Sequence, residues 1–171
     1  MTGFPSPAAE PVRPEELYQS VILDHNRRPR NYREMEGADA RAEGKNPNCG
    51  DKVIVWLRLE GDTVADVSFR VPPGEGCAIS RASASIMTTA VKGKSVVEVE
   101  ALFARFINLL TVQRAARDPN ESPAPTSAPD LGSLEVFSGV SRFPHRVKCA
   151  TMAWHALHSA LREAVASAHG A

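Results

Sequence analysis

The sequence has little of what marks secreted, membrane-spanning or disulfide-rich proteins. It holds 3 cysteines in 171 residues, an odd number that does not make the disulfide framework of a small secreted protein. No uncharged stretch approaches the roughly 18 residues that a membrane span needs. Residues 1–13 contain no continuous apolar run of the kind that signal peptides carry. These absences predict a cytoplasmic protein with reduced thiols and no membrane insertion.

An excess of charge of one sign is also lacking. Lys plus Arg and Asp plus Glu are each 20, so the formal net charge is zero. Without a global basic field, neither nucleic acid nor an anionic membrane is an expected partner, and proteins or small ligands are favoured.

The length and the hydrophobic fraction of 43% suit one core, so residues 1–171 are predicted to form a single domain. Two segments are expected to lie outside that core. Residues 1–13 are predicted to be disordered, and the Pro-, Ser- and Ala-rich residues 118–133 are predicted to form a mobile loop.

Local sequence signals predict a small α+β fold. Pro14 and the acids after it open a helix over about 14–27. "KVIVWLRLE" and "TVADVSFRV" flank Gly61-Asp62 and predict an antiparallel hairpin with one solvated side. A third strand is expected around 37–44. Three helices should follow the hairpin, the second of them opened by the capping-box pair Ser95 and Glu98. The expected architecture is a small antiparallel sheet packed on one side by helices.

Two of the three cysteines are expected at helix starts. Cys77 follows "PPGEG" and precedes a helical apolar pattern, and Cys149 is predicted to begin the last helix. The positive end of a helix dipole favours the thiolate, which is the form that binds metal or attacks sulfur. Cys49 lies instead in the turn-forming stretch "KNPNCGDKV", two residues before Asp51. Simple packing of a thiol in the core remains the alternative for each cysteine.

Three thiols and one carboxylate could together bind a metal ion: Cys49, Asp51, Cys77 and Cys149. This set matches tetrahedral zinc in number and type of ligand, although the chain has no C-x-x-C pair to mark a zinc site by spacing. Four anionic ligands would leave an excess of negative charge on a divalent ion. The cations Arg146 and Lys148 beside the last cysteine are candidates to offset it.

A nucleophilic cysteine with a histidine base is the competing interpretation. His145 and His155 are near Cys149 in sequence. However, His155 is six residues along the same predicted helix and should point to another side, and no orienting Asn or Asp is evident. The sequence supports this alternative poorly.

Four collinear stretches resemble one family: "LYQSVILDHNRRPRN", "NPNCGD", "GCAISRASASIMT" with "VKGKS", and "GVSRFPHRVKCATMAWHAL". They are similar to the SufU branch of the NifU/IscU iron–sulfur cluster assembly proteins, and the resemblance runs from about Leu17 to Leu161. It implies a SufE/NifU-like fold. It also implies that Cys49, Asp51, Cys77 and Cys149 bind zinc and that Cys49 is the sulfur acceptor.

The resemblance further implies partners. In SufU-type proteins the sulfur donor is a SufS-like, pyridoxal-phosphate-dependent cysteine desulfurase, and the carried sulfur passes on to downstream cluster-assembly proteins. A histidine of the desulfurase would replace Cys49 on the zinc and so unmask its thiolate. SufU-type motifs also have an arginine three residues before the last cysteine, which implies that Arg146 would steady the thiolates or the persulfide; a solvated surface arginine is the alternative.

The alternative within the same family is an IscU-like scaffold, with iron or a [2Fe-2S] cluster in place of zinc. IscU-type sequences place a histidine directly before the last cysteine, where this chain has Lys148. A purely structural zinc site is a third interpretation. Two departures from the family pattern bear on the site: a longer approach to Cys77 over residues 71–76, and His145 as an additional candidate ligand.

Overall fold

The computed structural model describes residues 14–46, 50–111 and 143–169, together with 134, 136, 137 and 140. Residues 1–13 and 118–133, which were predicted to be disordered and mobile, lie outside the described residues. Along the chain, one helix is followed by three strands and then by further helices: α1 (Pro14–Arg27), β1 (Ala40–Asn46), β2 (Asp51–Glu60), β3 (Thr63–Arg70), α2 (Ala78–Val91), α3 (Val96–Thr111) and α4 (Pro144–His169). The predicted α+β class is confirmed.

The sheet is an antiparallel meander in the order β1-β2-β3. Its second turn falls on Gly61-Asp62 as predicted, and Gly61 adopts a φ of 60° that favours glycine. The third predicted strand exists, but it begins at Ala40 instead of near residue 37. Gly37 has a φ of 72° and belongs to the turn before the strand, so pairing starts only after it.

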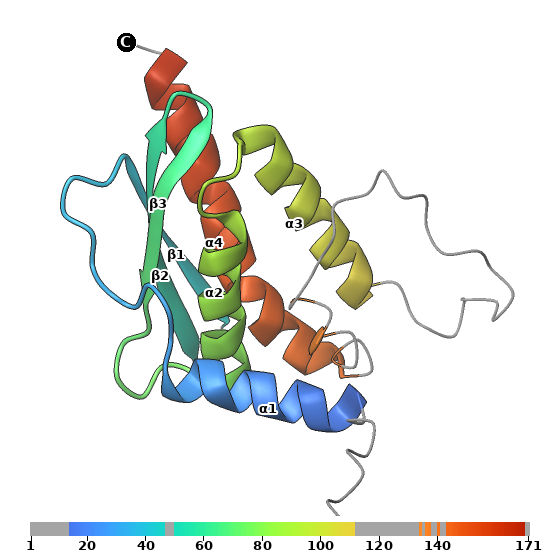
Figure 1. Ribbon diagram of the computed structural model, residues 1–171. Helices are drawn as coiled ribbons and strands as arrows, with labels where there is room; N and C mark the ends of the chain where they lie inside the picture. The colour runs from blue at the N-terminus through green and yellow to red at the C-terminus, as the bar shows by residue number, and fades with distance from the viewer. Residues whose placement is uncertain are drawn as a thin grey trace, which may run out of the picture.

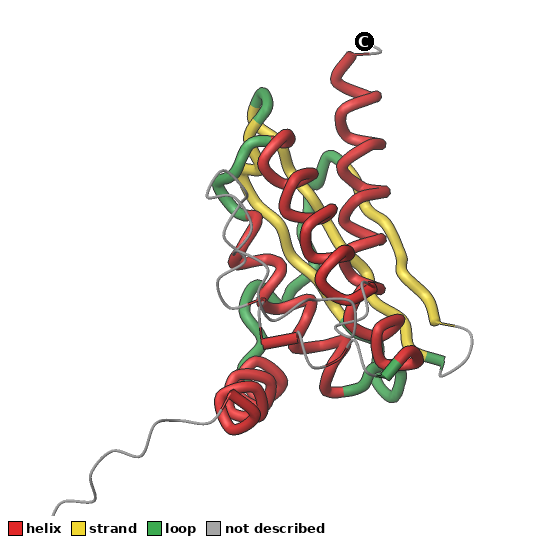
Figure 2. The backbone as a smooth tube through the Cα atoms, turned by 90° about the vertical axis from the view of Figure 1, so that its right-hand side faces the viewer, coloured by secondary structure: helices red, strands yellow, loops and turns green. Residues whose placement is uncertain are grey.

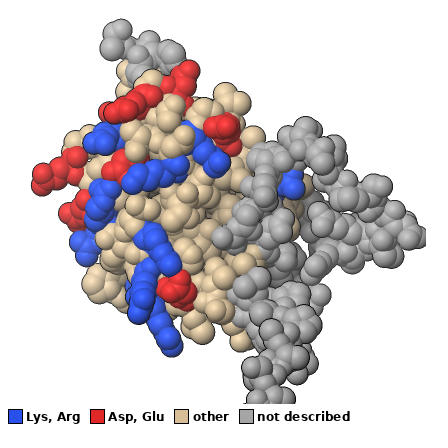
Figure 3. All heavy atoms as spheres, viewed as in Figure 1, with Lys and Arg blue, Asp and Glu red and all other residues tan. Residues whose placement is uncertain are grey.

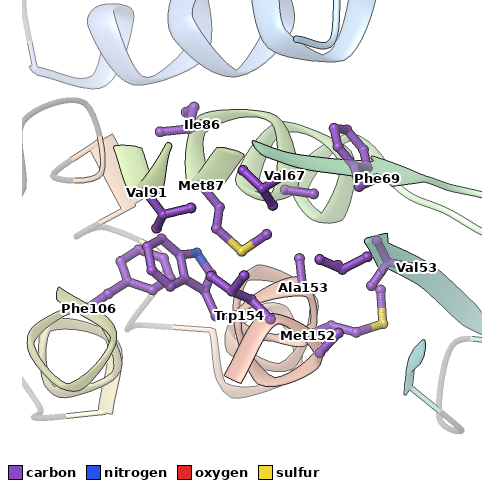
Figure 4. Packing of buried hydrophobic residues seen from close by; sticks show 14 of the residues in the cluster. Val53, Val67, Phe69, Ile86, Met87, Val91, Phe106, Met152, Ala153 and Trp154 are labelled. Atoms are coloured by element: carbon purple, nitrogen blue, oxygen red, sulfur yellow. The ribbon is translucent and has the colours of Figure 1, made fainter. Parts of the chain in front are cut away.

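The helices lie on one face of the sheet, as expected (Figure 1). α2 and α4 pack directly on the strands, α1 packs on α2, and α3 packs on α4. Figure 4 shows α4 contributing Met152, Ala153 and Trp154 to the core. The Trp154 ring lies 4.8 Å from the Phe106 ring, centroid to centroid, and is fully buried. Trp154 is therefore part of the hydrophobic core.

The other face of the sheet is less solvated than the strand pattern predicted. Trp56 on β2 is 8% exposed, and Ser68, its partner on β3, is fully buried. The guanidinium of Arg41 lies 5.9 Å from the Trp56 ring centroid and helps to cover it. The alternation of apolar and polar residues places Ser68 on the solvated side of the hairpin. The pattern within one strand does not reveal that a tryptophan on the neighbouring strand covers this serine.

The surface carries both signs of charge, in keeping with the net charge of zero. On the face seen in Figure 3, basic and acidic side chains are interspersed. Asp66, for example, pairs with Lys92 at 3.3 Å. In the described part of the chain, no helix combines the length and the apolar character that crossing a bilayer requires.

Candidate metal centre

The fold brings Asp51, Cys77 and Cys149 together. One ligand atom of each lies within 4.8 Å of the others. Asp51 is the first residue of β2, Cys77 directly precedes α2, and Cys149 lies on α4. Three of the four residues predicted to bind metal therefore converge from three separate elements.

Asp51 presents a buried carboxylate to this cluster. It is 8% exposed, and its Oδ2 atom has no hydrogen-bond partner. Burying a carboxylate oxygen without a donor is costly, and a bound cation would remove that cost. Two thiols and a carboxylate are also a donor set that zinc accepts. The residues present therefore fit a metal ion of this kind.

Cys77 is held in place by the helix that follows it. It is the N-cap of α2: the Ser80 backbone N–H donates to Sγ at 3.4 Å, and the Cys77 N–H donates to Ser80 Oγ at 3.1 Å. The predicted position of Cys77 at a helix N-terminus is confirmed. These bonds orient the thiol and satisfy the first turn of the helix.

The loop before Cys77 packs closely and depends on glycine. A Cβ atom on Gly76 would lie 2.2 Å from Cγ1 of Val71, so a side chain there would force the loop apart. The Lys52 N–H donates to the Glu75 carbonyl at 2.6 Å, which ties the start of β2 to this loop. The loop over 71–76 is thus hydrogen-bonded to the residue that follows Asp51.

Cys149 does not begin its helix. α4 starts at Pro144, so Cys149 lies in its second turn, and the prediction of a helix start at Cys149 was wrong. The first residues of α4 are exposed and carry no apolar pattern, whereas Pro144 suits the first helical position. Because the dipole effect fades beyond the first turn, Cys149 does not share the helix-terminal setting of Cys77.

The thiol of Cys149 is held by neighbouring polar groups. The side-chain N–H of Asn46 donates to Sγ at 3.8 Å, and the thiol contacts the His145 carbonyl at 3.7 Å. Ser83 Oγ on α2 donates to the carbonyl of Ala150, the next residue. These bonds fix Cys149 against both the sheet and α2.

Asn46, Ser80 and Ser83 escaped sequence reasoning, although they support the thiols. Asn46 opens the "NPNCGD" stretch, which was the one signal that could have drawn attention to it. Ser80 and Ser83 belong to a helix rich in small residues, where the sequence does not indicate which hydroxyl meets which backbone group.

The remaining residues predicted for the site either lie outside the described residues or are exposed at the surface. Cys49 lies outside the described residues; Gly50, which follows it, has a φ of 73° and donates its N–H to the Asn46 carbonyl at 2.8 Å. Arg146 is exposed, with its guanidinium 5.9 Å from the Phe143 ring centroid. Lys148 and His145 are exposed too, and the metal-ligand cluster found among the described residues does not include His145.

The histidine proposed as a catalytic base in the competing interpretation packs against a ring. His155 lies edge-on to Phe103, with 5.6 Å between the ring centroids. Partial burial lowers the pKa of His155 from its ordinary 6.5, and the charge of His158 adds to that effect. The geometry of His155 thus gives no support to a Cys-His pair with Cys149.

Comparison with known proteins identifies the family of this chain. Residues 17–150 match the family described as the NifU-like N terminal domain. The chain is 39% identical over 141 residues to the zinc-dependent sulfurtransferase SufU of Bacillus subtilis (strain 168), covering 82% of this chain and 86% of that protein. It is 37% identical over 153 residues to the iron-sulfur cluster assembly scaffold protein IscU of Streptococcus pyogenes serotype M1, covering 90% and 87%.

A solved structure extends the likeness to the fold. The crystal structure of a putative iron-sulfur cluster assembly scaffold protein for the SUF system, from Fervidobacterium islandicum AW-1, superposes with a TM-score of 0.69 at 30% identity. It covers 85% of this chain and 96% of that one. The chain belongs to the family of NifU-like N-terminal domains, and the resemblance found in the sequence is confirmed.

Proposed function

We propose that this protein accepts sulfur from the persulfide of a cysteine desulfurase during iron–sulfur cluster assembly, with zinc bound by Cys49, Asp51, Cys77 and Cys149. The observation that carries the proposal is the convergence of the last three residues, whose ligand atoms lie within 4.8 Å of one another. Cys49 would complete the set, since it is two residues from Asp51 in the chain. The zinc-dependent SufU of B. subtilis supports the choice of metal and reaction.

Zinc, when bound, would keep its thiol ligands deprotonated and therefore ready to react. The thiolate of Cys49 attacks the outer sulfur of the donor's persulfide. The sulfur–sulfur bond of the donor breaks, its cysteine leaves as a thiolate, and Cys49 carries the new persulfide. Arg146, which is exposed and can reorient, is the candidate cation to steady that anionic sulfur.

Cys49 is assigned the acceptor role because the other ligands are held in the fold. Cys77 caps α2, Cys149 bonds to Asn46, and Asp51 begins β2. Moving any of these side chains would disturb an element of the fold. Cys49 instead follows the Asn-Pro-Asn turn sequence, in which a local rearrangement releases only one ligand.

The second candidate is a scaffold on which a [2Fe-2S] cluster is built. The IscU scaffold protein of S. pyogenes favours it, at nearly the same identity and over a larger share of the chain. Thiolates from the same three cysteines could equally bind iron in a cluster. The two candidates differ in the metal that the purified protein carries.

The experiment combines metal analysis with a desulfurase assay. Protein purified without added metal should hold about one zinc per chain and should speed cysteine turnover by the desulfurase of the same organism. Cys49→Ala should abolish the stimulation yet keep zinc, whereas Asp51→Ala, Cys77→Ala and Cys149→Ala should lose zinc and stability. Iron with acid-labile sulfide and no stimulation would instead support the scaffold. Stimulation by Cys49→Ala would overturn the acceptor role.

A further inference from the structure

A groove of about 240 Å³ opens beside the metal-ligand cluster, between β1 and α4. Gly44, Lys45 and Asn46 of β1 form one side, and Lys148, Thr151 and His155 of α4 form the other. The three helical residues are three to seven positions apart, so they lie on one stripe of α4. The groove therefore runs along the strand and the helix together.

The strand side of the groove is the edge of the sheet that β1 forms. In the described part of the chain, β1 pairs with β2 alone. The opposite edge is partly occupied, because Phe69 of β3 exchanges backbone hydrogen bonds with Asn31 and Arg33. Figure 2 shows β1 at the margin of the sheet beside the long C-terminal helix. Alternate backbone groups of an edge strand point outward and can pair with another strand.

Gly44 keeps the strand and the helix close enough to form this groove. A Cβ atom at this position would lie 2.7 Å from the Met152 carbonyl oxygen and 2.9 Å from Met152 Cγ. A strand edge lying against a helix is the arrangement in which several domains bind an extended peptide as an added strand. The geometry thus favours an extended occupant over a helical one.

The charge around the groove favours an acidic occupant. Lys148 is exposed, and the Lys45 side chain is 66% exposed and only 3.9 Å from its nearest carboxylate, Glu43. That carboxylate is already shared with Arg41 at 2.9 Å and Lys52 at 3.6 Å. Side chains of a strand added to β1 would alternate between the two faces of the sheet, so acidic ones could meet Lys148 on the side of α4 and Lys45 on the opposite face.

The groove is also continuous with the thiols. Asn46 lines it and at the same time donates to Cys149 Sγ. We propose that the groove binds an extended, acidic segment of the protein that donates sulfur, added to the sheet as a fourth strand on β1. This inference rests on the proposed function, because the sulfur donor is the macromolecule that must approach Cys49.

The test uses the zinc-loaded full chain and the cysteine desulfurase of the same organism. Hydrogen exchange of backbone amides in residues 40–46 should slow at least tenfold in the complex, because strand addition protects edge amides. In the double variant Lys45→Glu/Lys148→Glu, the concentration of this protein needed for half-maximal stimulation of the desulfurase should rise at least tenfold. Zinc content is measured for each protein, since Lys148 adjoins Cys149.

The control variant Lys94→Glu/Arg58→Glu makes the same charge change at exposed positions away from the groove and should behave as wild type. Stimulation with unchanged exchange in β1 and an unaffected double variant would overturn the groove and leave the proposed function intact. Protection of β1 without stimulation would retain the groove and overturn sulfur transfer. The absence of both protection and stimulation would overturn both proposals. Protection that depends on protein concentration without the desulfurase would identify a second copy as the occupant instead.

Discussion

Asn46 links three parts of the site at the scale of a single residue. It is the last residue of β1 and pairs with Asp51, its side chain donates to Cys149 Sγ, and its carbonyl accepts the Gly50 N–H. The same residue therefore fixes the strand that delivers Asp51, the thiol on α4 and the start of the segment that contains Cys49. A displacement of Asn46 would therefore shift the candidate ligands Asp51 and Cys149, but not Cys77.

Gly44 is the residue whose side-chain size should matter most for the packing of α4 on β1. Gly44→Val should lower the free energy of unfolding by about 3 kcal/mol, because the new side chain meets the Met152 backbone, which cannot simply rotate away. Urea denaturation followed by circular dichroism measures the change.

The matched control places the same side chain one residue further along the strand. Lys45 is exposed on the opposite face of β1, so Lys45→Val should change the stability by less than about 0.5 kcal/mol. If both variants lost the same amount of unfolding free energy, the residue type in the β-strand, and not contact with α4, would explain the loss.

At the scale of elements, sequence patterns located most helices and strands but misplaced the ends that lack an apolar signature. α3, for example, buries apolar residues that recur at helical spacing: Val99, Leu102, Phe106 and Leu110. The start of α4 was missed because Pro144 to Arg146 are exposed. Periodicity reports only the buried part of a helix, so an exposed first turn must be read from its proline or cap.

The capping box at the start of α3 should contribute to the stability of the protein. The Glu98 N–H donates to Ser95 Oγ at 3.2 Å, and the Ser95 N–H donates to Glu98 Oε2 at 2.8 Å. Ser95→Ala should cost about 1 kcal/mol of unfolding free energy at neutral pH. Chemical denaturation at several pH values measures this loss.

The pH dependence of the stability of Ser95→Ala tests the role of Glu98 in this cap. The backbone and hydroxyl of Ser95 lower the pKa of Glu98 from its ordinary 4.5, so the stabilisation from its carboxylate is present above that value and is lost as the pH falls. The gap between Ser95→Ala and wild type should therefore narrow in acid. Ser159→Ala, at an exposed site inside α4, should show no loss at any pH. A constant gap for Ser95→Ala would show that the Ser95 hydroxyl does not stabilise the helix through the Glu98 carboxylate.

At the scale of the whole molecule, the sequence could nominate the ligands but not show that they meet. Few cysteines, an aspartate beside one of them and a family resemblance were enough to propose Cys77, Cys149 and Asp51. Their convergence depends on the tertiary path of the chain, above all on α4 returning to the start of β2. The groove between β1 and α4 was not predictable for the same reason, since its walls come from residues 44–46 and 148–155.

The attachment of α1 to α2 should make stability depend on pH. His25 Nδ1 lies 2.7 Å from Ser85 Oγ, and burial, together with the charge of Arg30, lowers the pKa of His25 from 6.5. The unfolded chain then binds this proton more readily than the folded one, so the free energy of unfolding should fall as the pH drops below about 6.5. Denaturation of chelator-treated protein at pH 8 and pH 5.5 measures the fall without interference from metal.

His25→Gln removes the titrating group and should show a smaller fall over the same interval. At pH 8 the variant and wild type should differ only by the altered contact with Ser85, worth about 1 kcal/mol. Parallel pH curves for the two proteins would show that other groups, and not His25, carry the dependence.

The positions of the ligands along the chain also constrain when metal can enter. Residue 149 is synthesised after residues 51 and 77, and the described cluster needs all three. A nascent chain lacks the third candidate ligand until α4 has been synthesised. A metal ion bound by all three residues could therefore enter only after α4 has packed against β2, and proteolytic loss of α4 should release it.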